Sequence, residues 1–144
     1  MLTVDVIEMG TVVDHIHAGM GAKVLKILGI DESYPNRVAL VMNVPSKRMG
    51  KKDIVKIEGK IISEGSVNTI ALISPGASIN IIKNSKVEKK FEVQLPDKLS
   101  GIGKCPNPNC MTNSENDVSK AFTKEDSGYR CHFCERLFRA EELV

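Results

Sequence analysis

Apolar and polar positions repeat along the chain with two different periods, and the changes between these periods predict most of the elements. Residues 2–9, LTVDVIEM, alternate apolar and polar side chains, as in a strand with one buried face. Gly10 indicates a turn, and Asp14 is then placed to cap a helix whose apolar positions recur near helical spacing. We expect this helix to end at Gly29, with two internal glycines that weaken it or permit close packing.

The remainder of the first two thirds of the chain repeats these patterns. A second helix is expected to begin at Ser63 or Ser66 and to stop before Pro75. Alternation predicts four further strands, over 38–44, 52–58, 77–83 and 86–93. The resulting β-α-β-β-α-β order with an extra strand predicts an α+β, ferredoxin-like domain, with two helices on one face of an antiparallel sheet.

The segment from Pro96 to Lys98 indicates a boundary between two domains, over residues 1–97 and 98–144. The second part is too short to be stable through apolar burial alone, so we expect a small all-β domain held by a metal. Residues 112–117 are expected to form an exposed loop. A small core around the metal would come from Val118, Phe122, Tyr129, Phe133, Leu137 and Phe138.

Four cysteines carry the most specific pattern in the chain, and all lie in this second part. Cys105 and Cys110 form a C-x4-C pair, and Cys131 and Cys134 form a C-x2-C pair twenty residues later. Two close pairs separated by a loop suit tetrahedral Zn²⁺, and four sulfurs leave no open position for a catalytic water. We therefore predict one structural zinc ion per chain. Two disulfides, or iron in a rubredoxin-like site, are the alternatives.

Composition narrows the possible functions. Hydrophobic residues make up 42% and charged residues 26% of the chain, as in soluble globular proteins. We see no secretory signal and no stretch with the length of a membrane span, and therefore expect a cytoplasmic protein with reduced thiols. The net charge of +2 is weak for a nucleic-acid binder, although residues 47–60 are locally basic.

If both helices cover one face of the sheet, polar residues on the open face are free to bind a ligand. Strand alternation places Lys56, Lys90 and Asn80 on that face, beside apolar Ile82 and Ile7. With Asp14 and His15 at the end of the first strand, this surface would attract an anion and accommodate a base or a sugar. The alternative is that these lysines serve solubility and protect the sheet edge.

The sequence does not support catalysis. It contains no phosphate-binding glycine loop in the required context and no nucleophile elbow. His15, His17 and His132 do not form a metal-binding cluster by spacing. His132 lies between two cysteines, but four sulfurs already complete the coordination of zinc.

Taken together, these segments resemble the family of aspartate carbamoyltransferase regulatory chains along essentially the whole chain. The resemblance is carried by GTVVDHI (10–16), MGKKDIVKIE (49–58), SPGASINII (74–82), CPNPNC (105–110) and CHFC (131–134), which occur in the right order. It implies a non-catalytic allosteric subunit that takes part in pyrimidine biosynthesis. The implied complex contains two catalytic trimers joined by three regulatory dimers.

The resemblance also implies roles for individual residues. CTP would bind as inhibitor and ATP as activator, with Asp14 and Lys56 at the ribose and His15 and Lys90 at the phosphates. Asn109 would contact the catalytic chain. The base and the rest of the triphosphate would be lined by Ile7, Val12, Asn80, Ile82 and Val87.

The sequence departs from its enteric relatives at two places. Ser85 replaces a tyrosine, and only residues 1–3 precede the first expected strand, where those relatives carry a longer arm. We therefore expect a second nucleotide position, and joint inhibition by CTP and UTP, to be weak or absent. Two other functions remain open at this stage: a zinc-ribbon module that binds nucleic acid, and an iron-containing electron-transfer protein.

Overall fold

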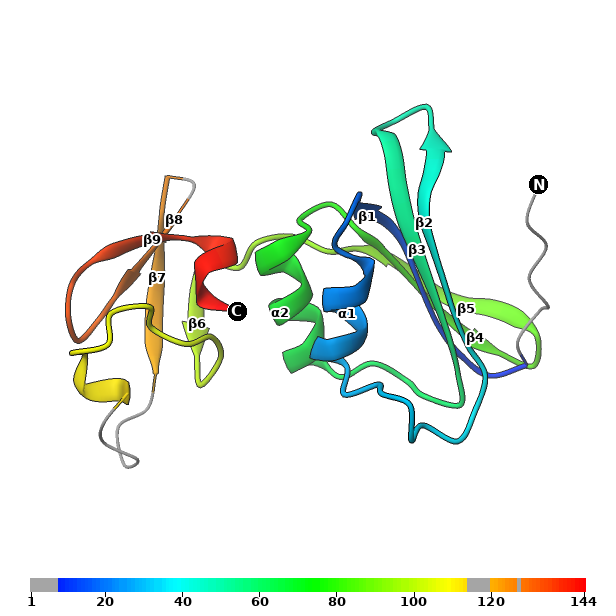
Figure 1. The fold of residues 1–144 in the computed structure, drawn as a ribbon, viewed down its shortest axis with the longest axis horizontal. Coiled ribbons are helices and arrows are strands. Elements are labelled where there is room, and N and C mark those ends of the chain that lie inside the picture. The colour runs from blue at the N-terminus through cyan, green and yellow to red at the C-terminus, as the bar shows by residue number, and fades with distance from the viewer. Residues whose placement is uncertain (1–7, 114–119, 127) are drawn as a thin grey trace.

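The chain forms two antiparallel sheets in the computed structural model, which describes residues 8–113, 120–126 and 128–144 (Figure 1). The larger sheet has the strand order β2-β3-β1-β4-β5, and the smaller has the order β6-β7-β8-β9. The first sheet and its helices comprise β1 (Gly10–His17), α1 (Gly21–Ile27), β2 (Val38–Ser46), β3 (Gly50–Glu58), α2 (Glu64–Ile73), β4 (Ser78–Lys83) and β5 (Lys86–Glu92). The second part comprises β6 (Lys98–Ser100), the 3-10 helix η1 (Met111–Asn113), β7 (Ala121–Glu125), β8 (Gly128–Cys131), β9 (Leu137–Arg139) and the 3-10 helix η2 (Ala140–Leu143).

This element order confirms the predicted α+β class, with a larger mixed domain followed by a small all-β domain. Both helices lie on one face of the larger sheet, between it and the smaller sheet (Figure 1). The opposite face of the larger sheet therefore points away from the second domain. Within the described residues, no helix combines the length and the apolar character needed to cross a membrane.

The first strand and the first helix that the structure describes lie at positions that the sequence pattern did not predict. The predicted turn at Gly10 and the helical start at Asp14 are wrong, because residues 10–17 form β1 and the helix begins only at Gly21. Of the strand expected at 2–9, residues 2–7 lie outside the described residues, and residues 8 and 9 belong to no strand. The expectation that only residues 1–3 precede the first strand likewise falls on residues outside the described ranges and stays a prediction.

A β-bulge explains this error. The pairing of β1 with β3 shifts between Val13 and Ile16, and His15 adopts a positive φ of 55° within the shift. An extra residue in a strand breaks the alternation of faces. Val13 and Ile16 are therefore both buried although they stand three residues apart, which is the spacing of a helix.

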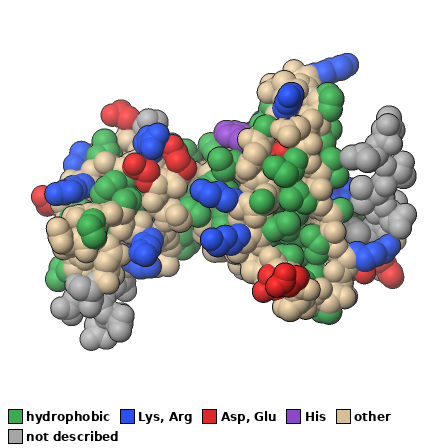
Figure 2. Space-filling view, in the orientation of Figure 1, with side chains coloured by type: hydrophobic (Ala, Val, Ile, Leu, Met, Phe, Trp, Pro, Cys, Tyr) green, Lys and Arg blue, Asp and Glu red, His purple; other side chains and the backbone are tan. Residues whose placement is uncertain are grey.

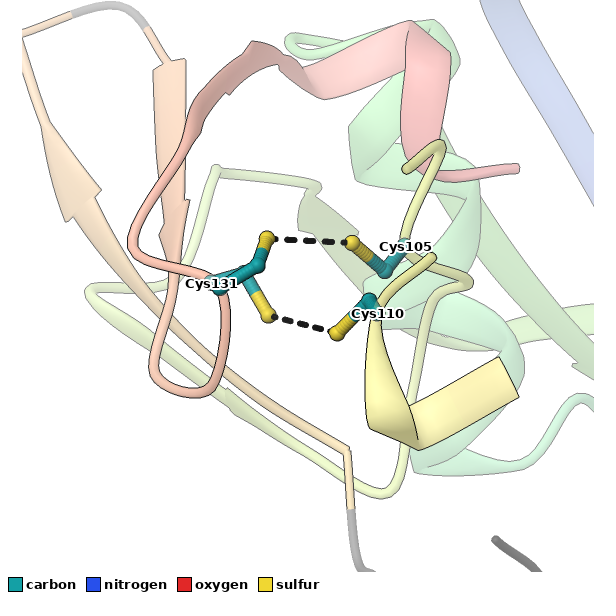
Figure 3. Close-up of side chains that lie close together, drawn as sticks. Cys105, Cys110 and Cys131 are labelled. Carbon is teal, nitrogen blue, oxygen red and sulfur yellow. Dashed lines mark hydrogen bonds between the residues drawn. The ribbon is translucent and has the colours of Figure 1, made fainter. Parts of the chain in front are cut away.

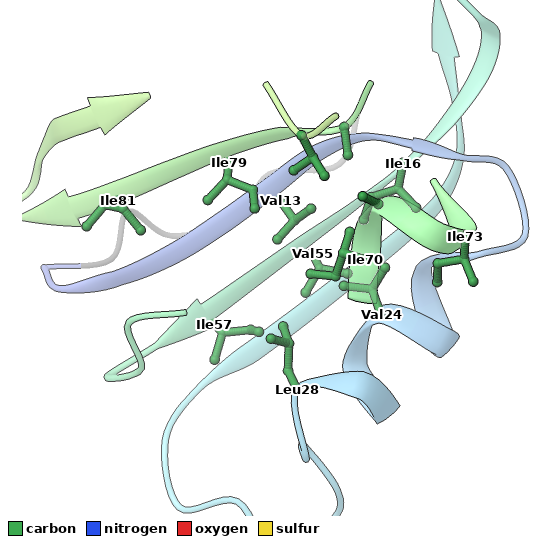
Figure 4. Close-up of a cluster of buried hydrophobic side chains, with 13 residues drawn as sticks. Val13, Ile16, Val24, Leu28, Val55, Ile57, Ile70, Ile73, Ile79 and Ile81 are labelled. Carbon is green, nitrogen blue, oxygen red and sulfur yellow. The ribbon is translucent and has the colours of Figure 1, made fainter. Parts of the chain in front are cut away.

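The core of the first domain lies between the helices and the inner face of the sheet (Figure 4). Val13 on β1 is paired with Val55 on β3 and with Ile79 on β4, and all three side chains are buried. Val24 of α1 and Ile70 of α2 cover them from the helical layer. Because successive side chains on a strand point to opposite faces, the strand neighbours of Val13, Val55 and Ile79 point to the open face of the sheet.

The turn between β1 and α1 is built around a buried carboxylate. Asp53 accepts hydrogen bonds from the backbone N–H groups of Gly19 and Gly21 at 3.0 and 2.9 Å, and from that of Asn43 at 3.0 Å. A Cβ atom on Gly21 would lie 2.5 Å from Leu40 Cδ1 and 3.0 Å from an oxygen of Asp53. Gly21 therefore permits the close packing that its position in the sequence suggested.

α2 begins at the first of the two serines that the sequence pattern indicated. Ser63 is the N-cap, and its hydroxyl oxygen accepts the backbone N–H of Ser66 at 3.3 Å. The helix ends before Ser74, whose backbone N–H still bonds to Ile70, and Pro75 follows. Four consecutive residues at the end of the helix, from Ile70 to Ile73, are buried. A helical turn that is buried on every side must have packing partners on more than one side.

The second partner of α2 is the small domain. Leu72 is 1% exposed and belongs to the same apolar cluster as Leu99, Phe122 and Leu143, while its neighbour Ala71 belongs to the core of the first domain. η2 contacts α2 directly. One helix therefore contributes adjacent side chains to two cores.

The small core agrees only in part with the sequence prediction. Phe122 and Tyr129 are buried, and Phe138 packs against them. The placement of Phe133 and Leu137 in this core was wrong, since their exposed fractions are 40% and 49%. Leu137 lies on β9, the edge strand of the small sheet, and Phe133 lies in the turn before it, so solvent reaches both side chains. Val118 and the expected loop at 114–117 lie outside the described residues, while Thr112, which was assigned to that loop, is buried in η1.

Candidate functional site

The four cysteines converge on one point of the small domain (Figure 3). Cys105 and Cys110 lie in the loop between β6 and η1, whereas Cys131 ends β8 and Cys134 follows it in the turn toward β9. Their sulfurs all lie within 4.8 Å of one another. The distance is 3.6 Å from Cys105 to Cys134 and 3.8 Å from Cys110 to Cys131.

These distances match tetrahedral coordination by four thiolates. Zn–S bonds of about 2.3 Å place the sulfurs about 3.8 Å apart at the corners of a tetrahedron. A disulfide would need two sulfurs about 2.05 Å apart, and all four cysteines are free. The ring of His132 instead hydrogen-bonds to Thr123 through Nε2, so the structure gives it a partner other than the sulfur cluster.

The loop that carries the first cysteine pair is held by its own polar side chains. The Asn113 amide donates to the carbonyl oxygens of Cys105 and Asn107 at 2.9 and 2.7 Å. The backbone N–H of Asn109 donates to the side-chain oxygen of Asn107 at 3.1 Å. This bonding leaves Asn109 exposed on the loop.

The thiols differ in how readily they ionise. Burial raises the pKa of Cys105 to about 12 and also raises the pKa of Cys131. Burial opposes ionisation of Cys110 too, but hydrogen bonds from the hydroxyl and the backbone of Thr112 outweigh it and lower the pKa to about 7. The pKa of Cys134 is lowered against burial by hydrogen bonds, of which that from the Arg136 backbone is the largest. A metal cation must therefore displace protons when it binds.

On the open face of the larger sheet, four of the residues predicted to bind a nucleotide lie in one row. Val12 of β1 is paired with Lys56 of β3 on one side and with Asn80 of β4 on the other, and Asn80 is paired with Lys90 of β5. Residues directly opposite one another on neighbouring strands project to the same face. The row therefore crosses four strands on the side away from the helices.

Asp14 and His15 lie at the bulge of β1, one step further along the same strand. Asp14 forms an ion pair with Lys52 at 3.0 Å, and Nδ1 of His15 lies 3.1 Å from the hydroxyl of Ser78. Lys52 and Ser78 were not among the predicted site residues. No local pattern could have identified them, because only the strand register brings them to Asp14 and His15.

The other predicted residues lie apart from this row. Ile82 and Val87 are paired beyond an irregularity in the β4–β5 ladder, and Val87 is 57% exposed on the edge strand. Asn109 belongs to the other domain. Ile7 lies outside the described residues.

On the face that Figure 2 shows, the surface charge does not favour a nucleic-acid interface. Figure 2 shows basic and acidic side chains scattered over both domains on the face in view, without a continuous basic patch. Several described basic side chains are also neutralised locally, as in the pairs Arg48–Glu92 and Arg37–Glu58. Phosphate-backbone recognition would favour a basic stripe.

Comparison with known proteins agrees with the resemblance seen in the sequence. Residues 2–94 match the family model described as the aspartate carbamoyltransferase regulatory chain, allosteric domain, and residues 97–144 match the metal binding domain of the same chain. The chain is 51% identical to the aspartate carbamoyltransferase regulatory chains of Pyrococcus horikoshii and Pyrococcus furiosus, with 99% of this chain and 96% of each relative aligned. The corresponding chain of Methanopyrus kandleri is 43% identical, with 99% and 93% aligned. This chain therefore belongs to the family of aspartate carbamoyltransferase regulatory chains, as a non-catalytic subunit.

Proposed function

We propose that this chain binds CTP as an inhibitor and ATP as an activator on the open face of the larger sheet, and transmits the difference to catalytic chains. The observation that carries the proposal is the row Lys56–Val12–Asn80–Lys90 across four paired strands. It combines two cations, an amide and an apolar side chain on a face that the helices do not cover. Phosphates, a sugar and a base need these groups.

The spacing of the two lysines supports an elongated ligand. Three strand spacings separate the backbones of Lys56 and Lys90, which amounts to about 14 Å. An extended ligand can therefore contact both lysines without either side chain folding over the sheet. A nucleoside triphosphate lying along the row would place its ribose near Lys56 and Asp14, and its phosphates near Lys90 and His15. Val12, Asn80, Ile82, Val87 and Ile7 would line the remainder.

The ion pair of Asp14 with Lys52 fits the same assignment. A carboxylate near a phosphate binder would repel the ligand, but Lys52 neutralises that charge at 3.0 Å. The carboxylate still has acceptor capacity for sugar hydroxyl groups. The hydrogen bond of His15 to Ser78 orients the imidazole on the same side of the bulge.

We further propose that the metal is zinc and that its role is structural. The four sulfurs and their tetrahedral spacing fit Zn²⁺, and four protein ligands leave no open coordination position for water. Cys105, Cys110, Cys131 and Cys134 would hold one ion per chain. The ion would supply folding free energy that a domain of this size lacks, on the order of 10 kcal/mol.

In the proposed assembly, the small domain contacts the catalytic chain and the chain pairs with a second copy of itself. Two catalytic trimers and three regulatory dimers would then form the cytoplasmic complex. The exposed position of Asn109, on a loop stiffened by Asn107 and Asn113, suits a contact with the catalytic chain. UTP is a further candidate ligand.

A continuous set of contacts is available to carry the signal between the two domains. The backbone N–H of His17, at the end of β1, donates to the buried hydroxyl of Ser74 at 3.0 Å. Ser74 caps α2, and Leu72 of that helix packs in the core of the small domain. CTP and ATP would shift the complex only by their differential affinity for its two states, about 1–3 kcal/mol.

Reconstitution with the cognate catalytic trimer tests the proposal. The purified chain is first titrated with CTP, ATP and UTP by calorimetry, and the reconstituted complex is then assayed with each nucleotide. We expect CTP to lower and ATP to raise activity at subsaturating aspartate. If no nucleotide binds and none changes the activity, the proposed function is wrong.

A further inference from the structure

Thr112 places a hydroxyl group against one of the four sulfurs. It lies in η1, two residues after Cys110, and its Oγ1 is 3.1 Å from the Cys110 sulfur. Both residues are buried, with exposed fractions of 7% and 3%. Bulk water therefore cannot readily replace this contact if the hydroxyl is removed.

The direction of the hydrogen bond follows from the chemistry of a metal ligand. A thiolate bound to a cation has no proton, so it can only accept, and the threonine hydroxyl must donate. Four thiolates outweigh the charge of one divalent cation, and this excess lies in an apolar core formed by residues such as Leu99 and Phe122. The hydroxyl adds a donor that disperses this charge, beside the backbone hydrogen bond that Cys110 also receives from Thr112.

The surrounding loop holds the hydroxyl in place. Asn113, the next residue, donates to two carbonyl groups on the opposite side of the loop, and the backbone N–H of Asn113 bonds to the carbonyl of Cys110. These bonds attach η1 to both ends of the loop that carries the two cysteines, at Cys105 and at Cys110. The backbone that carries Thr112 is therefore held in the conformation in which its hydroxyl contacts the sulfur.

We propose that Thr112 is a positioning residue of the metal centre, whose hydroxyl donates to the Cys110 thiolate and slows loss of the metal. This inference rests on the proposed four-cysteine zinc site. It extends that site beyond its ligands to a residue that the C-x4-C pattern does not include.

The test compares zinc release from the full chain carrying threonine, valine or serine at position 112. Thr112→Val keeps the shape of the side chain and removes the hydroxyl, whereas Thr112→Ser keeps the hydroxyl. Each zinc-loaded chain is mixed with an excess of a coloured chelator, and the release rate is recorded. We expect release from Thr112→Val to be about tenfold faster, and release from Thr112→Ser to stay near the unmodified rate.

A spectroscopic measurement separates the hydrogen bond from simple packing. In the Co²⁺-substituted chain, loss of a donor to sulfur makes the thiolate more electron-rich, so the sulfur-to-cobalt charge-transfer band should move to longer wavelength in Thr112→Val only. Thr69→Val is the control, because Thr69 bonds within α2, on an exposed surface. If the valine chain does not fold, Thr112→Ala carries the same comparison.

The outcomes distinguish this inference from the proposal on which it rests. Equal release rates for the threonine and valine chains, or release from the serine chain as fast as from the valine chain, would overturn the role of the hydroxyl. An unshifted cobalt band in Thr112→Val would do the same. A wild-type chain that takes up no zinc or cobalt would instead refute the metal site itself.

Discussion

Asp53 shows how much one buried side chain can organise. Its carboxylate accepts three backbone N–H groups, from Gly19, Gly21 and Asn43, and so joins the end of β1, the start of α1 and the irregular part of β2. No pattern in the sequence around Asp53 predicts this role. Each bond is charge-assisted, the carboxylate itself is fully buried, and the bond to Gly21 is buried with it, which makes the loss of the set costly.

Replacing Asp53 by alanine should lower the free energy of unfolding of the first domain by about 3 kcal/mol, because three backbone donors, of which that of Gly21 is buried, lose a charged acceptor. Chemical denaturation followed by circular dichroism measures the change. Asp31→Ala is the matched control, because Asp31 is exposed and bonds only within its own turn. Equal stability of the two variants would contradict the organising role of Asp53.

Neighbouring lysines on β5 provide a sharp test of the open face. Lys90 is paired with Asn80 on that face, whereas Lys89 is paired with Ile81 and lies over the ring of Phe91 at 5.4 Å. Lys90→Ala should weaken CTP binding about tenfold or more, through loss of a charge-assisted contact to phosphate. Lys89→Ala should leave binding nearly unchanged. Calorimetric titration measures the CTP affinity of both variants. An equal loss of affinity in the two would show that the ligand does not bind on the open face.

At the scale of elements, α2 is the piece that both domains share. Its Ile70 and Ala71 pack under the larger sheet, while Leu72 packs with Phe122 and Leu143 of the small domain. Tyr129 reinforces this junction, because its hydroxyl donates to the carbonyl of Pro96 at 2.6 Å. Burial, with Asp97 nearby, raises the pKa of that tyrosine, so it remains a donor.

Shortening Leu72 to alanine should open a cavity between the domains and cost about 3 kcal/mol of stability. CTP should still bind, since Leu72 is on the far side of α2 from the open sheet face, but inhibition of the reconstituted complex should weaken. Thermal unfolding, calorimetry and the activity assay measure the three effects. Thr69→Ala, on the exposed side of the same helix, is the control. Unchanged inhibition by CTP would show that this contact does not carry the signal.

For the whole molecule, the metal site separates assembly from ligand binding. Cys110→Ala should unfold residues 98–144, because three sulfurs no longer satisfy the ion and the small core is insufficient alone. CTP binding to the first domain should persist, while assembly with the catalytic trimer should be lost. Size-exclusion chromatography with the trimer measures assembly, and normal assembly of the variant would contradict a structural metal.

The pH dependence of zinc binding follows from the thiol pKa values. Cys105, with a pKa of about 12, and Cys131, whose pKa is also raised, are protonated at neutral pH, so zinc must displace at least two protons. Lower pH therefore weakens binding, by about 100-fold per pH unit near neutrality. Below about pH 7 Cys110 also becomes protonated and the dependence should steepen. Chelator competition at a series of pH values from about 5.5 to about 8 measures how zinc affinity changes with pH. An affinity that does not change with pH would exclude thiolate ligation.

Much of this architecture was predictable because it depends on short-range chemistry. The paired cysteine spacing, the Ser63 cap and the alternation of β3 and β4 each act within a few residues, and the structure has each element where the pattern indicated. Local rules failed at β1, where a bulge places Val13 and Ile16 on one face at helical spacing. They also failed at Phe133 and Leu137, since residue type alone cannot say which aromatic and aliphatic side chains a small core will bury.

By itself, the sequence determined the fold class and the four-sulfur cluster, because periodicity and spacing are properties of the chain. The family followed from the resemblance of its motifs to known chains. Only the tertiary structure decided which residues lie opposite one another on neighbouring strands and which pack together between the domains. The row from Lys56 to Lys90, the partners of Asp14 and His15, and the dual burial of α2 all depend on strand register and on domain packing. Register couples residues up to dozens of positions apart through backbone hydrogen bonds, and a single bulge resets it, so no local pattern contains that information.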